Sequence, residues 1–132
     1  MKILLFRTAP EKEEKIQELC KKQGIQLSKV PRKDYGQKIG YLAGIKGFPR
    51  ENKVYRGEEF PAEMLVFSGM DSEQLDAFLK AYRESGIPPI GCKGILTPNN
   101  VFWTAEELFR ELWKEHLTMN QLKMSSEKPC SR

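Results

Sequence analysis

Between residues 63 and 116, short apolar runs alternate with helical segments that have clear start signals, and this pattern constrains the fold more than any other feature. The apolar runs at 64–67 and 90–96 have the length and composition of buried strands. A capping box opens each helix, with Asp71 and Gln74 in the first and Thr104 and Glu107 in the second. Two strands joined through one helix run parallel. We therefore predict a strand–helix–strand–helix unit of an α/β domain.

The first 30 residues repeat the same order. Residues 2–7 contain a continuous apolar run, which predicts a strand buried on both faces. Thr8 begins a T-x-x-E capping box, and we predict a helix from there to Gly24, where a left-handed residue can end it. Residues 25–30 alternate between apolar and polar, as an edge strand does.

Residues 31–61 form an irregular, basic, glycine-containing insertion. We predict that Asp34 caps a short helix ending at Gly44. On such a helix Gly36, Gly40 and Gly44 would share one face and let another backbone come close.

Together these elements predict one small α/β domain over residues 1–117, built from four alternating strand–helix units. Its sheet would have four strands, mixed or parallel, and residues 118–132 would form a flexible tail. The alternative is a ferredoxin-like, split βαβ sheet of the α+β class, with residues 34–57 inserted between its halves. No apolar run reaches the roughly 20 residues of a membrane helix, and we expect a cytoplasmic protein.

Motifs for the common chemistries are absent from the sequence. It contains no dinucleotide fingerprint, P-loop or nucleophile elbow. The single histidine, His116, excludes a histidine-based metal cluster, and three cysteines without a C-x-x-C pair do not indicate a zinc site. We therefore assign no catalytic residue, metal or cofactor, although Cys92 as a nucleophile stays a remote alternative.

Two polar turns follow the strands of the 63–116 unit, and they are the candidate binding edge. If the strands are parallel, both turns lie at the same edge of the sheet, where open α/β sheets bind ligands. Turn formation alone is the competing explanation for these residues. The candidate ligand- or partner-binding residues are Ser68, Gly69, Thr97, Asn99, Asn100 and Trp103.

Positive charge is concentrated between residues 20 and 57, where ten Lys and Arg face only Asp34 and Glu51. Such a window attracts nucleic acid or another polyanion, or it is a solvated surface. The sequence lacks an RNA-recognition strand, so this hypothesis is the less favoured one. The candidate basic patch comprises Lys29, Arg32, Lys33, Lys38, Arg50, Lys53 and Arg56.

The 63–116 unit is also where a family resemblance lies. The segments EMLVFSGMDSEQLDAFLKAYRESGIPPI and KGILTPNNVFWTAEELFRELWKEH are similar to the bacterial domain-of-unknown-function family 3783. The FSG turn, the G-I-P-P-I joint and T-P-x-N followed by W-T carry the resemblance. It implies a small bacterial cytoplasmic α/β domain and supplies no activity, catalytic residue or cofactor.

The leading functional hypothesis is a non-enzymatic binding or regulatory module. It would recognise a protein or small ligand at the edge formed by the 68–71 and 97–103 turns. Nucleic-acid binding through the 20–57 window is the alternative, and the oligomeric state does not follow from the sequence.

Overall fold

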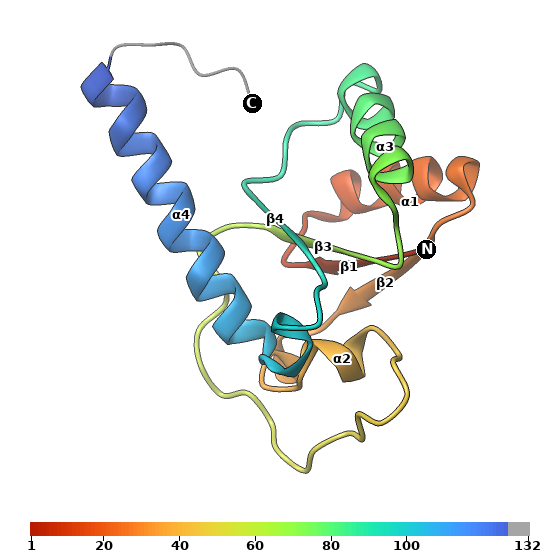
Figure 1. The fold of residues 1–132 in the computed structure, drawn as a ribbon, viewed down its shortest axis with the longest axis vertical. Helices are drawn as coiled ribbons and strands as arrows, with labels where there is room; N and C mark the ends of the chain where they lie inside the picture. Colours follow the sequence, from red (N-terminus) through yellow and green to blue (C-terminus); the bar gives the residue numbers. More distant parts are fainter. Residues whose placement is uncertain (127–132) are drawn as a thin grey trace.

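The computed structural model describes the backbone of residues 1–126 and the side chains of residues 1–115. In chain order the strands and α-helices alternate (Figure 1), and the chain also contains two short 3-10 helices, η1 and η2. The elements are β1 (Lys2–Phe6), α1 (Pro10–Gln23), β2 (Gln26–Val30), η1 (Arg32–Asp34), α2 (Ile39–Leu42), β3 (Met64–Ser68), α3 (Ser72–Glu84), β4 (Cys92–Ile95), η2 (Asn100–Phe102) and α4 (Ala105–Ser126).

The four strands form one mixed sheet in the order β2-β1-β3-β4. The pairs β1–β2 and β3–β4 are parallel, whereas β1 and β3 pair antiparallel in the middle. This confirms the predicted α/β class with a mixed four-stranded sheet. The ferredoxin-like alternative is wrong, because the two strands of each βαβ unit are direct neighbours and no other strand separates them.

Both faces of the sheet are covered, which explains why its central strands read as continuous apolar runs. In β1, Ile3 and Leu5 belong to the core that α1 and α3 cover, while Leu4 and Phe6 belong to a second core beneath α4. Strand β3 divides its side chains between the two cores in the same way. Figure 1 shows α1 and α3 together on one side of the sheet.

Helix α1 starts one residue later than the sequence pattern predicts. Its N-cap is Ala9, which has no side-chain capping bond, and Pro10 is the first helical residue. The Thr8 capping box is therefore wrong, and the Thr8 hydroxyl donates instead to the Phe6 carbonyl at 3.4 Å. A cap at Thr8 would make Ala9 helical directly before a proline, which the proline ring disfavours. Gly24 ends the helix with a φ of 71°, as predicted.

The capping boxes of α3 and α4 are confirmed. At α3, the Gln74 amide donates to the Asp71 carboxylate at 2.8 Å, and the Asp71 amide donates to the Gln74 side chain at 2.9 Å. At α4, Thr104 and Glu107 exchange the equivalent bonds at 2.9 and 3.1 Å. Local sequence alone sets these helix starts, because both partners lie within one turn.

The segment between β2 and β3 does not contain the helix predicted from Asp34 to Gly44. The chain forms η1 and then only four helical residues in α2, so the three glycines do not line one helix face. Tertiary bonds end the local helical pattern. Lys38 forms an isolated antiparallel β-bridge with Thr104, and the Ile39 amide donates to the Trp103 carbonyl at 2.8 Å.

This segment, residues 31–61, crosses the face of the sheet that α4 also covers, and then returns. It leaves the carboxyl end of β2, reaches α2, and brings Gly44 near Lys2 at the opposite edge. On return, Phe60 enters the core between the rings of Tyr35 and Phe109, at 4.1 Å from each. These stacked rings anchor a segment that has little regular structure of its own.

The buried side-chain amide of Gln37 holds the returning part of this segment in place. Gln37 is 0% exposed. Its amide nitrogen donates to the carbonyls of Glu51 at 2.9 Å and Lys53 at 3.3 Å, and its oxygen accepts from the Glu51 amide at 2.9 Å. A polar side chain at this depth is stable because all of these bonds are made.

Helix α4 continues through Ser126, across the first part of the tail predicted from residue 118. Residues 127–132 lie outside the described residues, as do the side chain of His116 and all of Cys130. Within the part of the chain that is described, no helix combines the length and apolar character needed to cross a membrane.

Replacing Gln37 tests this anchoring. We expect Gln37→Met to lower the free energy of unfolding by about 2 kcal/mol, because it leaves partly buried backbone groups of Glu51 unpaired. Gln17→Met, on the exposed side of α1, is the matched control and should change stability by less than about 0.5 kcal/mol. Urea unfolding measures both, and equal stability of the two variants would contradict the role of Gln37.

Candidate functional site

The two polar turns do lie at one edge of the sheet, as the parallel prediction requires. Strands β3 and β4 are neighbours, with Phe67 opposite Ile95, so the turns that follow them start side by side. The Leu96 amide also donates to the Phe67 carbonyl at 2.8 Å. The prediction of position is therefore confirmed, whereas binding at this edge stays a prediction.

Within the second turn, Thr97 and Asn100 use their side chains to hold the turn itself. The Asn100 oxygen accepts from the Thr97 amide at 2.8 Å, and its nitrogen donates to the Ile95 carbonyl at 2.9 Å. The Thr97 hydroxyl accepts from the Asn100 amide at 3.1 Å. Asn99 is exposed and forms no side-chain hydrogen bond with any described residue. Asn99 is therefore the member of this trio whose side chain takes no part in holding the turn.

The remaining predicted edge residues have structural explanations of differing strength. Gly69 has a φ of 69°, which a glycine adopts without strain, so the turn after β3 accounts for its identity. Trp103 is half-buried against the α4-side core, and its carbonyl accepts the Ile39 amide. Ser68 is half-buried at the end of β3, opposite Lys2.

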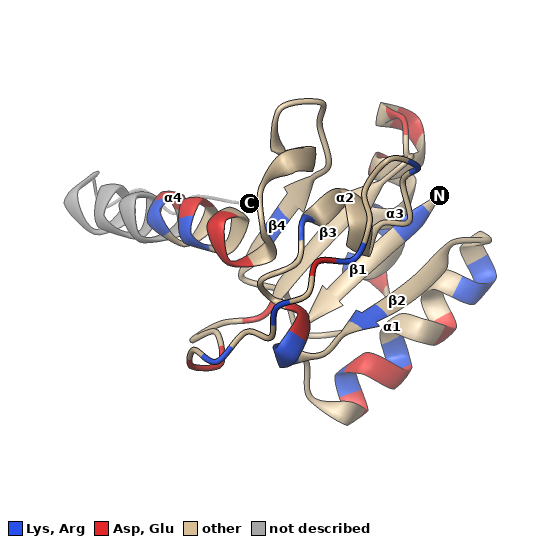
Figure 2. Ribbon diagram, turned by 90° about the horizontal axis from the view of Figure 1, so that it is seen from below, with Lys and Arg blue, Asp and Glu red and all other residues tan. Residues whose placement is uncertain are grey.

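Ion pairs neutralise much of the predicted basic patch. Arg50 lies 2.8 Å from Asp34, Lys29 lies 2.8 Å from Glu13, and Lys38 and Lys53 both lie near Glu51. Figure 2 shows acidic and basic positions interleaved along α1 and along the segment that contains Glu51. Three members have no ion pair among the described residues: Arg32, Lys33 and Arg56.

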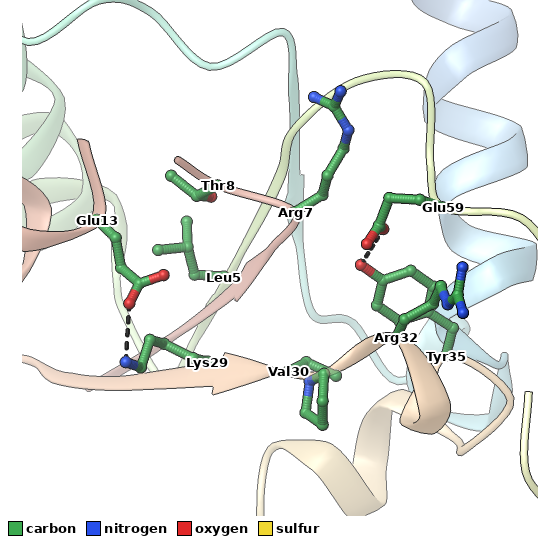
Figure 3. Close-up of a pocket in the computed structure, with 10 residues that line it drawn as sticks. Leu5, Arg7, Thr8, Glu13, Lys29, Val30, Arg32, Tyr35 and Glu59 are labelled. Carbon is green, nitrogen blue, oxygen red and sulfur yellow. Dashed lines mark hydrogen bonds and ion pairs between the residues drawn. The ribbon is translucent and has the colours of Figure 1, made fainter. Parts of the chain in front are cut away.

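A pocket of about 290 Å³ opens at the opposite edge of the sheet, where the parallel strands β1 and β2 end (Figure 3). Side chains from the end of β1, the start of α1, the end of β2, η1 and the 31–61 segment surround it. Its lining combines apolar and charged groups: Leu5, Arg7, Thr8, Glu13, Lys29, Val30, Pro31, Arg32, Tyr35 and Glu59.

Arg7, one of the lining residues, has an unusual backbone conformation. Its φ of 49° is left-handed, and it is the only non-glycine residue with positive φ among the described residues. This conformation costs about 1 kcal/mol or more, and such residues cluster at functional sites. The side chains of Arg7 and Arg32 form no hydrogen bond or ion pair with any residue that the structure describes.

Tyr35 and Glu59 form the wall between these two arginines. The Tyr35 ring is buried, and its hydroxyl donates a short hydrogen bond to the Glu59 carboxylate. Burial and this carboxylate raise the pKa of the Tyr35 phenol well above its usual value, so the hydroxyl stays protonated and remains a donor. In the view of Figure 3, Arg7 and Arg32 lie on different sides of this bond, and the Arg7 guanidinium points away from it.

Sequence reasoning named Lys29 and Arg32 as parts of a broad patch and missed the pocket. A usable signal was present, because ligands in open α/β sheets bind beyond the carboxyl ends of parallel strands. Applied to the strands predicted at 2–7 and 25–30, that rule points to Arg7, Thr8 and Arg32. Tyr35 and Glu59 had no such signal, because the path of the irregular 31–61 segment places them there rather than the end of a strand.

Cys92 does not have the environment of a nucleophile. It is 2% exposed in the core beneath α4, and burial raises the pKa of its thiol. Burial likewise raises the pKa of the Cys20 thiol, to about 11. The reactive form of cysteine is the thiolate, which both sites disfavour at neutral pH. Among the described residues, no cluster of His, Cys, Asp and Glu could hold a metal ion.

These features define a small α/β domain with a mixed sheet and a charged pocket at one edge. Residues 63–119 match the family model described as "Domain of unknown function (DUF3783)", which confirms the resemblance of the 63–116 unit. The match covers β3, α3, β4 and the first part of α4, whereas β1 and β2 at the pocket edge precede it. No curated protein and no solved structure matches the chain.

Neighbouring asparagines allow the structural role of the 97–100 turn to be tested. We expect Asn100→Ala to lower the free energy of unfolding by about 1 to 3 kcal/mol, because it leaves partners at Thr97 and Ile95 unpaired. Asn99→Ala, one residue away, should change it by less than about 0.5 kcal/mol. Urea denaturation gives both values, and the reverse order would show that Asn99 carries the turn.

Thiol reactivity tests the environment of Cys92. With iodoacetamide at pH 7.5 to 8 (about one unit or less below the usual thiol pKa), we expect Cys20 and Cys92 to stay unmodified in the folded protein. Both should react once urea unfolds the chain, which mass spectrometry of the peptides detects. Rapid modification of Cys92 in the folded protein would restore it as a candidate nucleophile.

Proposed function

We propose that this protein is a cytoplasmic, non-enzymatic binding module whose pocket between β1, β2 and Tyr35 takes a small anionic ligand. The observation that carries the proposal is the pair of arginines at the pocket, Arg7 and Arg32, neither with a side-chain hydrogen bond or ion pair within the described residues. Two guanidinium groups present several donors in planes that suit carboxylate or phosphate oxygens.

The other pocket groups restrict the ligand further. Lys29 and Glu13 are paired with each other, so they contribute little net charge. Leu5 and Val30 offer apolar contact, while Thr8 offers a hydroxyl whose bond to the Phe6 carbonyl is long, at 3.4 Å. At about 290 Å³ the pocket is at the small end of ligand sites. A small phosphate monoester or dicarboxylate fits this size and charge.

Recognition of a protein or small ligand at the 68–71 and 97–103 turns is the second candidate. Its support is the exposed Asn99 side chain, which makes no hydrogen bond within the described part of the chain. The bonds that hold Thr97 and Asn100 within the turn favour the pocket over this edge.

Anion titration tests the pocket. We expect inorganic phosphate and succinate, added separately to labelled protein, to shift the amide resonances of Arg7, Thr8 and Arg32 in NMR spectra. Arg7→Gln and Arg32→Gln should each weaken binding about tenfold, because a charge-assisted hydrogen bond contributes about 1.5 to 3 kcal/mol. A stronger response to phosphate would assign a phosphorylated ligand, and a stronger response to succinate a carboxylate.

Arg56→Gln is the matched control, since Arg56 is an exposed arginine of the 31–61 segment that does not line the pocket. It should leave the dissociation constant unchanged within about twofold. Potassium chloride at equal ionic strength separates specific binding from charge screening. Shifts that are equally large with chloride, or equally reduced in all three variants, would contradict the proposal.

A further inference from the structure

A second surface combines one exposed and two half-buried aromatic rings with positive charge, at a place remote from the pocket. Phe102 of η2 is 62% exposed, which is unusual for so large an apolar side chain. Its ring lies 5.3 Å from that of Phe48, which comes from the 31–61 segment. Helix α2 packs against η2 and brings these two parts of the chain together.

The Phe48 ring is seated on the backbone of α2. A Cβ atom added at Gly40 would lie 2.8 Å from this ring, so only glycine permits the contact. Next to Gly40, the Tyr41 ring lies 5.8 Å from the Arg50 guanidinium, which also donates to the Tyr41 hydroxyl at 3.4 Å. The surface is therefore a set of rings held by packing, with an arginine at its side.

Lysines are the unpaired charged residues of this surface, because its arginine, Arg50, is paired with Asp34 at 2.8 Å. The two segments that build it, residues 39–50 and 91–103, contain Lys46, Arg50 and Lys93 and no acidic residue. The acidic residues that flank them in sequence are occupied elsewhere. Glu51 pairs with Lys38 and Lys53, Glu106 pairs with Arg110, and Glu107 caps α4.

We infer that the Phe48–Phe102 surface binds single-stranded nucleic acid. Unstacked bases stack on exposed aromatic rings, and lysine and arginine side chains beside the rings attract the phosphates. Binding of an apolar helix from another protein would not require that these two segments lack acidic residues. The inference also joins two groups of residues that the sequence placed apart, the 97–103 turn and part of the 20–57 basic window.

The Phe48–Phe102 surface is separate from the anion pocket, because the two lie at opposite edges of the sheet. The pocket follows the carboxyl ends of β1 and β2. The Phe48–Phe102 surface follows the carboxyl end of β4. Strand β3 lies between this end of β4 and the amino-terminal half of β1. Variants of Arg7 and Arg32 should therefore leave oligonucleotide binding unchanged.

Fluorescence anisotropy with labelled oligo-dT and oligo-U of about 12 nucleotides tests this inference, a length within the range of single-strand sites. At about 50 mM salt we expect binding to one or both, and Phe102→Ala should weaken it about tenfold, the loss of one stacked base. Lys46→Gln should lower the slope of log affinity against log salt by about 1. Preference for oligo-U over oligo-dT would assign RNA.

Val54→Ala is the matched control, since Val54 is an apolar residue of the same segment, 58% exposed, with a smaller side chain to lose. It should leave binding unchanged, and urea unfolding should show that both variants are as stable as the original protein. Absence of binding to both oligonucleotides would overturn the inference. Unchanged affinity in Phe102→Ala, or equal affinity for duplex DNA, would also overturn it. Either result would indicate that charge attraction alone, without base stacking, causes the binding.

Discussion

The antiparallel pairing of β1 with β3 in the middle of the sheet is the constraint on which the rest of the structure depends. Each strand has a parallel partner on its outer side, so each half is a βαβ unit with its own carboxyl edge. Because the central pair is antiparallel, those two edges point in opposite directions. The protein thus presents two places of the kind at which α/β sheets bind ligands.

The 31–61 segment then completes both edges. Tyr35 and Glu59 form a wall of the pocket at one edge, while Phe48 and the residues of α2 meet η2 at the other. Stacking of Phe60 between Tyr35 and Phe109, together with the buried Gln37 amide, holds this segment across the sheet. A segment that is mostly irregular is therefore the part of the chain that shapes both candidate sites.

Sequence patterns predicted the local features well, because those features depend on neighbouring residues. The capping boxes of α3 and α4, the left-handed end of α1 at Gly24 and the buried strands all followed from short motifs. The failures arose where distant residues compete with local ones. The helix expected to start at Asp34 shrinks to α2, because Lys38 and Ile39 bond to residues more than 60 positions further along the chain.

The sequence by itself determined that this chain is an α/β domain, where α3 and α4 begin, and that the turns after residues 68 and 96 share an edge. Only the tertiary structure decided the antiparallel centre of the sheet, the pocket around Arg7 and Arg32, and the contact of Phe48 with Phe102. The physical reason is range. Caps and strand patterns are short-range interactions that a few residues encode, whereas each candidate site is assembled from segments that meet only when the sheet forms.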